Sequence, residues 1–344
     1  MGMITPSYAL VHPSYMIPDF IVNYQQASGY TELLSTGNPM VRLGEGDLYV
    51  YAKTLDIRTK LAASQSAANQ LPSVDIATGL ISTPTYLCRT RAEYDHHDTA
   101  AAGQWGLSIV DAYTKGNDQA FFQQFRASGL YGFNAANGEG VVNTAGSTAT
   151  NLPTDPYSHD TVVTYDNGYM AFFLAQQIQL LLTRCNQMGI PDLKITILGP
   201  QRTLGLFAWA IVQLTQAQRI GAGALSTTQT LEMIGEWNDV DIGITYDDTL
   251  IGQGVPNGNG ATDLVLIVLP ELKRPGGHEI DTNEFAKVTP NLEACVVQLC
   301  DMIRPRQIPT PIPGGGIDVT YEARMTPGWG LRGEAITQIS MQYQ

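Results

Sequence analysis

The fold is decided by residues 105–143, WGLSIVDAYTKGNDQAFFQQFRASGLYGFNAANGEGVVN. Apolar side chains recur close to a helical period and predict a long amphipathic helix, at Leu107, Val110, Tyr113, Phe121, Phe122 and Phe125. Gly129 is the expected stop of this helix, and Gly132, Gly138 and Gly140 then permit tight turns. Phosphate-binding loops follow a strand and open a helix, whereas these glycines follow a helix and no Walker lysine accompanies them. The segment therefore predicts architecture and not nucleotide chemistry.

Composition indicates a protein that associates with itself. The chain has 344 residues, of which 44% are hydrophobic and 15% are charged, against about 25% charged in an average soluble protein. The length of the chain is enough for about two domains, or for one domain with large excursions. A surface with so few charges is sticky, so we expect extensive self-association.

The net charge of -13 argues against a dedicated nucleic-acid binder, because phosphate contacts need clustered lysines and arginines. The densest basic groups are only pairs, Arg89 with Arg91 and Arg304 with Arg306. A negative wall can still enclose DNA, since weak repulsion lets the polymer slide along it. Plain solubility is the other reading of the same charge.

The cysteines fit a reducing cytoplasm, and we expect neither a signal peptide nor a membrane span. Four cysteines are too few and too scattered for a disulfide framework, and we expect buried reduced thiols at Cys88, Cys185, Cys295 and Cys300. The first residues lack the basic and apolar regions of a signal peptide. No apolar run approaches the ~18 residues of a membrane span.

The first hundred residues predict an arm and a hairpin. Prolines between residues 1 and 45 favour an extended arm. Leu48–Arg58 and residues 85–98 both have strand composition, and the second alternates apolar and charged side chains. We expect these two strands to pair as a long hairpin around a polar tip. Such a hairpin has little core of its own, so we expect it to pack on another subunit.

A second helix is expected over residues 167–188, with Asp166 or Asn167 as its cap and Gly189 and Pro191 as its end. Its apolar stripe is Met170, Leu174, Ile178, Leu181, Cys185 and Met188. Mixed α/β structure follows. We expect a helix at 203–219, an exposed glycine-rich loop at 251–262, and strands at 193–200, 239–247, 262–271, 316–328 and 335–343.

One cluster could carry chemistry, at Glu93-Tyr94-Asp95-His96-His97-Asp98. Neighbours on a strand point to opposite faces, so only alternate members could converge on one metal ion. A solvated hairpin end is the competing reading. No serine lies in a GxSxG elbow, and no cysteine has a recognisable catalytic setting. The sequence therefore predicts no catalytic residue, no cofactor and no metal ligand.

The order of parts resembles the tailed-bacteriophage major capsid proteins of the Hong Kong 97-type fold. In that family a long spine helix follows an extended loop and leads into a "G…G-hydrophobic-hydrophobic-N" turn. Gly138-Glu139-Gly140-Val141-Val142-Asn143 is similar to that turn, and KITILGPQRTLGLF at 194–207 is similar to the family's strand-then-proline segment. The resemblance implies an α+β capsid fold with an N-terminal arm, an extended β-hairpin loop, a long spine helix, a peripheral domain and an axial domain.

The resemblance also implies a division of the chain. The expected segments are an N-terminal arm at 1–45, the extended loop at 46–100, the peripheral domain with the spine helix at 101–192, the axial domain at 193–285, and a return to the peripheral domain at 286–344. Some relatives cross-link a loop lysine to a neighbour's asparagine. Lys53 and Lys60 are the lysines near this hairpin, and nothing marks either as reactive.

By resemblance the chain is a structural protein and not an enzyme: a major capsid protein that forms the icosahedral head shell of a tailed phage. Its partners would be other copies of itself, in hexamers and pentamers, with decoration, portal and scaffolding proteins as further candidates. It would enclose double-stranded DNA without binding it specifically, and no membrane is involved. Its place would be the virion head, assembled in the host cytoplasm.

Three alternatives stay open. An encapsulin-like nanocompartment shell would hold a cargo protein in place of DNA. A metal-dependent enzyme would use His96 and His97, and stoichiometric metal in elemental analysis would favour it. Another virion component, such as a tail or decoration protein, would assemble helically or as trimers.

Overall fold

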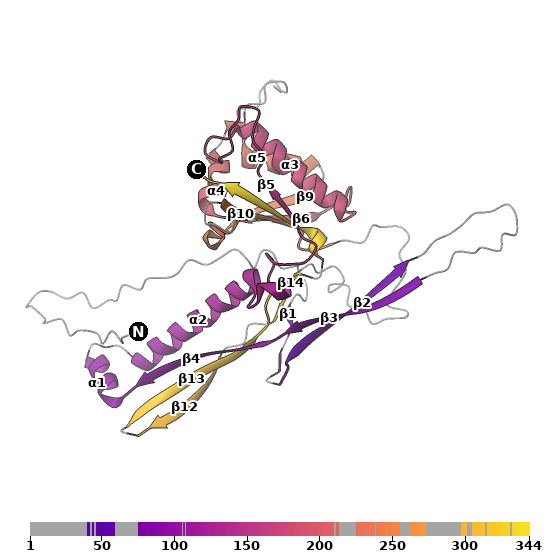
Figure 1. Ribbon diagram of the computed structural model, residues 1–344. Helices are drawn as coiled ribbons and strands as arrows, with labels where there is room; N and C mark the ends of the chain where they lie inside the picture. The colour runs from indigo at the N-terminus through magenta and orange to yellow at the C-terminus, as the bar shows by residue number, and fades with distance from the viewer. Residues whose placement is uncertain are drawn as a thin grey trace, which may run out of the picture.

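A computed structural model describes most of the chain, as residues 40–41, 43–44, 46–58, 75–104, 106, 108–209, 211–212, 225–237, 239–254, 262–272, 297–300, 305–313, 315–330 and 332–344. The described chain forms an elongated body, built on a long helix and a narrow sheet, and a compact α/β body (Figure 1). Several predicted features lie outside the described residues: nearly all of the N-terminal arm, the hairpin tip with Lys60, the middle of the loop 251–262, residues 213–219, and Cys295.

The long helix is α2, Ile109–Tyr131. Ser108 caps its start, since the Ser108 hydroxyl accepts a hydrogen bond from the backbone N–H of Asp111. The predicted stop at Gly129 is wrong, because Gly129 keeps helical geometry and the helix runs on to Tyr131. The true stop is Gly132, whose φ of 70° lies in the region that favours glycine.

A narrow antiparallel sheet lies along α2, with the order β12-β13-β4 (Figure 1). Its strands are β4 (Tyr86–Tyr94), β12 (Arg306–Ile312) and β13 (Gly316–Met325). Alternate residues face the helix and are buried, among them Ala92, Val319 and Tyr321. The Tyr321 hydroxyl lies 3.3 Å from the Thr114 hydroxyl of α2, so the helix and the sheet are joined by packing and by a polar contact.

The hairpin is built differently from the prediction. Strand β2 (Tyr49–Arg58) pairs antiparallel with β3 (Asp75–Pro84), in a register that joins Tyr49 to Pro84 and Arg58 to Asp75. The predicted partner, residues 85–98, pairs instead with β13 and ends as a strand at Tyr94. The predicted pairing failed because residues 75–84 stand closer to the tip than residues 85–98 do, so their pairing with β2 closes a shorter loop.

The compact body contains a five-stranded mixed sheet of order β5-β15-β10-β6-β9. Its strands are β5 (Thr148–Asn151), β6 (Leu193–Gly199), β9 (Val240–Tyr246), β10 (Thr262–Val268) and β15 (Ile336–Gln342). The predicted strands at 193–200, 239–247, 262–271 and 335–343 are thus confirmed in this sheet. The predicted strand at 316–328 is confirmed as β13 of the narrow sheet. Consecutive residues of β10 are buried, so both faces of this strand are covered.

Three helices accompany this sheet: α3 (Asn167–Arg184), α4 (Gln201–Trp209) and α5 (Thr227–Trp237). Asp166 caps α3 as predicted, since its carboxylate accepts from the N–H groups of Gly168 and Tyr169. The predicted stripe on α3 is buried as far as Leu181, but the helix ends at Arg184 and Met188 is half exposed. The helix predicted at 203–219 is shorter, because the chain turns into β7 (Ile211–Val212).

The remaining described elements are short. A three-stranded sheet joins β1 (Met40–Val41), β11 (Val297–Cys300) and β14 (Trp329–Gly330), and β7 pairs with β8 (Leu225–Ser226). A nine-residue helix, α1 (His96–Gln104), follows β4, and 3-10 turns lie at Ala135–Asn137, Asp248–Leu250 and Gly333–Ala335. No described helix has both the length and the apolar character that crossing a membrane requires.

Sheet membership does not follow the predicted division of the chain. Strands β5 and β15 and helix α3 come from segments assigned to the peripheral domain, yet both strands belong to the α/β sheet and α3 packs on it. The buried apolar residues of the two bodies form one continuous cluster. The two bodies therefore share a core across their junction.

Three backbone segments cross at the C-terminal end of α2. The N–H groups of Val141 and Val142 donate to the carbonyls of Gly129 and Leu130, and the N–H of Gly140 donates to the carbonyl of Gly328. The spacing leaves no room for side chains: a Cβ on Gly140 would lie 2.5 Å from the carbonyl oxygen of Leu130. Gly140 also has a φ of 86°. A glycine at position 140 is therefore required by both space and conformation.

We expect Gly140→Ala to lower the free energy of unfolding by at least about 2 kcal/mol, because it adds a clash to a left-handed φ. Gly116→Ala is the matched control, since Gly116 lies within α2 with nothing within 4 Å of its added Cβ. That control should raise the free energy by about 0.5–1 kcal/mol through helix propensity. Urea denaturation of dispersed subunits measures both, and equal effects of the two variants would contradict the crowding at Gly140.

Candidate assembly surfaces

The hairpin β2–β3 exposes large apolar side chains. Leu48, Tyr49, Tyr51, Ile76 and Leu80, which we call the hairpin surface, are each more than half exposed. Residues 76–80 are exposed in succession, so both faces of this part of β3 are open. The hairpin extends away from the compact body (Figure 1). A two-stranded ribbon with this composition is marginal on its own, so it is suited to covering by another chain.

A polar clamp fixes the base of the hairpin to the long sheet. The Thr85 hydroxyl donates to the carbonyl of Asp47 at 2.5 Å, and the Thr85 N–H donates to the carbonyl of Leu48 at 3.0 Å. From β13, Arg324 donates to both the Asp47 carbonyl (3.1 Å) and the Thr85 hydroxyl (2.9 Å). The strands leave the elongated body from a fixed root, so the direction of the hairpin is set by this clamp.

Glu139, in the glycine-rich turn, is a buried carboxylate with four donors. One oxygen accepts from the N–H groups of Phe133 (3.1 Å) and Asn134 (2.8 Å). The other accepts from the Tyr86 hydroxyl (2.7 Å) and the Asn137 amide (3.3 Å). Burial and the contact with Glu139 raise the pKa of Tyr86 to about 12. The carboxylate thereby ties the first residue of β4 to the turn that ends α2.

Asn143 closes the same turn. Its side-chain amide donates to the carbonyls of Tyr131 and Glu139, each at 2.9 Å. Tyr131 is the last residue of α2, so Asn143 satisfies a carbonyl that the helix leaves without an intrahelical partner. Val141 between them is 2% exposed and belongs to the core. In this motif the glycines therefore allow the backbone segments to cross closely. The apolar pair contributes to the core, and the asparagine caps the helix.

The outward side of α3 is uncharged. Its exposed positions are Tyr169, Phe172, Gln176, Gln179, Leu180 and Thr183. Phe172 is 68% exposed although it lies between the buried Ala171 and Phe173. A helix that faced only water would place charged side chains at such positions. This side of α3 is therefore a second candidate contact surface.

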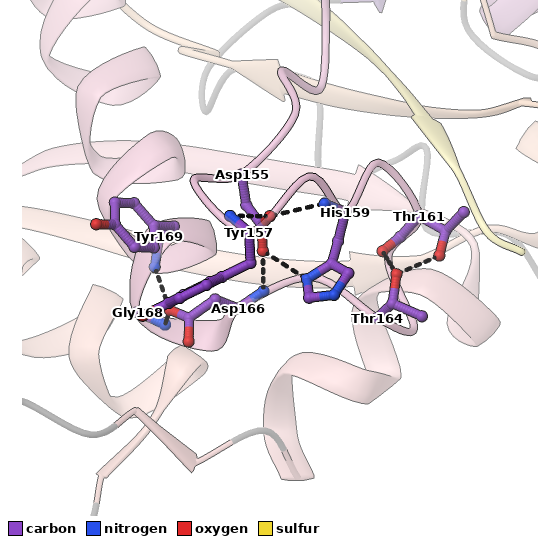
Figure 2. A network of polar contacts seen from close by, with 8 residues as sticks. All are labelled: Asp155, Tyr157, His159, Thr161, Thr164, Asp166, Gly168 and Tyr169. Carbon is purple, nitrogen blue, oxygen red and sulfur yellow. Dashed lines mark hydrogen bonds and ion pairs between the residues drawn. The ribbon is translucent and has the colours of Figure 1, made fainter.

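Asp155 orders the loop that leads into α3 (Figure 2). Its carboxylate is fully buried and accepts from the backbone N–H groups of Tyr157 (2.9 Å), His159 (2.8 Å) and Asp166 (3.2 Å), with the His159 ring 2.9 Å away. Burial acts to raise the pKa of Asp155, but these hydrogen bonds outweigh it, so the pKa lies below its usual value. The loop presents Tyr157 beside the start of α3, where Tyr157 is 66% exposed.

The cluster at residues 93–98 does not lie on one strand. β4 ends at Tyr94, and Asp95 begins α1 by a reciprocal pair of bonds: the Asp98 N–H donates to the Asp95 carboxylate (2.8 Å) and the Asp95 N–H donates to Asp98 (3.2 Å). The rings of His96 and His97 lie with centroids 3.9 Å apart. Among the described residues, no group of three or more histidines, cysteines, aspartates or glutamates is arranged to hold a metal ion.

The environment of two of the four cysteines, Cys88 and Cys185, is described. Cys88 and Cys185 are not joined in a disulfide and are half-buried, so they are less buried than predicted. The Cys185 thiol lies 3.4 Å from the carbonyl of Glu334, and burial raises its pKa to about 11. Cys185 is therefore a poor nucleophile at neutral pH.

Sequence reasoning missed the anchoring carboxylates. Glu139 and Asp155 stand in polar, glycine- or proline-rich segments, where a carboxylate usually faces water. A third, Asp263 on β10, is also fully buried and receives Arg202 and Thr203 from α4. The spacing in Asp155-Pro156-Tyr157-Ser158-His159 was the available signal, because an aspartate often accepts hydrogen bonds from the backbone just after it.

Comparison with known proteins bears on the fold. No protein-family model and no curated protein matches the sequence. Solved structures do match: the capsid of Myoviridae phage XM1 at TM-score 0.66 and 12% identity, over 97% of this chain and 100% of that one. A structure from Gordonia phage Cozz matches at 0.55 and 13%, over 97% and 92%, and the capsid of cyanophage P-SCSP1u at 0.52 and 10%, over 96% and 93%.

The chain is thus an α+β protein whose fold, over nearly its whole length, is similar to that of the phage XM1 and cyanophage P-SCSP1u capsid structures. More particularly, it has the Hong Kong 97-type fold, with the long helix α2, the extended hairpin β2–β3 and the glycine-rich turn in the expected order. The resemblance inferred from the sequence is confirmed at the level of the fold.

We expect Glu139→Gln to lower the free energy of unfolding by about 2–3 kcal/mol, since an amide cannot accept from all four donors. Glu93→Gln, at a half-exposed side chain, is the matched control and should change the free energy of unfolding by less than about 0.5 kcal/mol.

The folded pKa of Tyr86 lies above the ordinary value of 10, so the contribution of Tyr86 to stability is complete below pH 10 and is lost as pH rises toward 12.

Tyr131 titrates in the same window, because burial raises its pKa to about 12 as well. Tyr86→Phe should therefore flatten the alkaline fall in stability only in part, and Tyr86→Phe with Tyr131→Phe should flatten it further. Urea denaturation between about pH 8 and pH 12, the range around the ordinary tyrosine pKa, measures this. An unchanged alkaline fall in the double variant would contradict the assignment.

Proposed function

We propose that this chain is a major capsid protein that assembles into the icosahedral head shell of a tailed phage. The observation that carries the proposal is the hairpin β2–β3, which holds large apolar side chains in solvent on a subunit with a capsid fold. A two-stranded hairpin supplies little core of its own, and the described part of the chain leaves these side chains more than half exposed, so a neighbouring copy is their natural cover.

We further propose which part of the subunit forms which domain. The elongated body with α2 serves as the peripheral domain, and the α/β sheet with the uncharged side of α3 serves as the axial domain, around which hexamers and pentamers close. Decoration, portal and scaffolding proteins are further partners of such a shell. The net charge of -13 suits a wall that encloses double-stranded DNA without binding it specifically. The site of action is the virion head, after assembly in the host cytoplasm.

Electron microscopy of the expressed protein is the direct test. We expect closed shells or rings of capsomers at micromolar concentration, and a monodisperse monomer would refute the proposal. Particles recovered from infected cells should contain DNA. A particle holding a single cargo protein would support the encapsulin-like alternative, helical or trimeric assemblies would support another virion component, and stoichiometric metal on a monomer would support the enzyme.

We expect Ile76→Ser with Leu80→Ser to abolish shell assembly while leaving the subunit folded. Both side chains are 61% exposed, so their loss removes contact area with a neighbour and little core packing. Thr78→Ser, at an exposed position of the same strand, is the matched control and should assemble normally. Sedimentation measures assembly and circular dichroism measures folding. Normal shells from the double variant would refute the intersubunit role of the hairpin surface.

A further inference from the structure

Strand β12 is an exposed sheet edge. It lies at one end of the order β12-β13-β4, and no described strand pairs with its outer side. Residues 306–311 are exposed in succession, so both faces of the strand are open as well. A free edge of this length is a template for pairing with another chain. In a protein with few charges, such an edge invites association in the wrong geometry.

The prolines of β12 have a definite orientation. The antiparallel register joins every residue from Arg306 to Ile312 to a residue of β13. In such a ladder alternate residues direct both N–H and C=O toward the partner strand. Pro309 and Pro311 have no N–H, so the ladder depends on the donors of Ile308, Thr310 and Ile312. The intervening residues, Gln307, Pro309 and Pro311, therefore point their backbone groups outward.

The opposite edge of the same sheet is different. Because residues of β13 alternate in direction, those not facing β12 face β4, and they pair with Tyr86, Cys88, Thr90, Ala92 and Tyr94. The outward backbone groups of β4 are then those of Leu87, Arg89, Arg91 and Glu93, and all four have an N–H. Prolines at outward positions thus distinguish the β12 edge from the β4 edge.

We propose that Pro309 and Pro311 close the β12 edge to strand addition, so that a neighbouring molecule meets β12 through side chains only. Two of the three outward donors are missing, and an incoming strand would leave its own carbonyls opposite the proline rings without partners. The inference stands apart from the proposed function, because it follows from the ladder of the subunit itself. Its consequence is that the sheet cannot be propagated from this edge by copies of the same chain.

Pro309→Thr with Pro311→Thr tests the closure in the full chain. We expect a several-fold rise in irregular, thioflavin-positive material at equal protein concentration, because the variant restores two outward donors. Gln307→Thr is the matched control: it adds the same side chain at an outward position that already has an N–H, and it should behave as the parent. Unchanged solubility and assembly of the double variant would overturn the proposal.

Hydrogen exchange on dispersed subunits of the double variant tests the orientation separately. The N–H groups introduced at positions 309 and 311 should exchange as fast as unstructured amides, whereas those of Ile308 and Thr310 should be protected. Protection at 309 and 311 in the dispersed subunit would show that they face β13 or another covered partner, and would overturn the proposal.

A proline scan gives an independent reading of the same orientation. Gln307→Pro should leave the melting temperature nearly unchanged, since it removes an outward donor. Ile308→Pro removes a ladder donor and should lower the melting temperature by at least about 2–4 °C. The reverse order of the two effects would place the prolines on the paired side and overturn the proposal.

Discussion

The structure depends on the close crossing of backbone at the end of α2. Gly132, Gly140 and Gly328 bring the helix terminus, the turn after it and the segment after β13 within hydrogen-bonding distance of one another. Only residues without a side chain allow this spacing, and Glu139 holds it by taking donors from the turn and from β4. The elongated body, the root of the hairpin and the passage to the α/β body all start from this point.

Sequence alone was enough for the elements whose signals are local. The period of α2, the cap Asp166 and the apolar strands β6 and β10 were all readable, because each depends on residues close in the chain. The partner of β2 was not readable, since strand pairing is decided by competition between segments and not by the composition of one segment alone. Strand β12 was missed for another reason: Pro309 and Pro311 argue against a strand unless it is known to be an edge.

The candidate surfaces were harder to foresee than the fold. Low charge predicted self-association, but composition cannot say which apolar side chains stay exposed. Phe172 and Phe173 are neighbours of the same type on α3, yet the first is 68% exposed and the second 7%. Only the orientation of the helix on the sheet separates them. The same holds for Glu139, whose burial follows from where Tyr86 is placed by the β4–β13 pairing.

Few charges leave a subunit with weak long-range repulsion, so wrong contacts must be limited by local means. On the side of the narrow sheet away from α2, Arg89 pairs with Glu322 at 3.1 Å and Arg91 pairs with Asp318 at 2.7 Å, which places two ion pairs on that face. The most exposed large apolar groups of the hairpin surface and of the outward side of α3 are more than half exposed, whereas those of the narrow sheet, Leu87, Ile308 and Ile317, are only 36–42% exposed. At the edge strand β12, Pro309 and Pro311 then remove outward backbone N–H donors. Attraction is thereby confined to surfaces that a neighbouring subunit of defined geometry can cover, and backbone pairing, which would accept any extended chain, is excluded where the edge is most exposed.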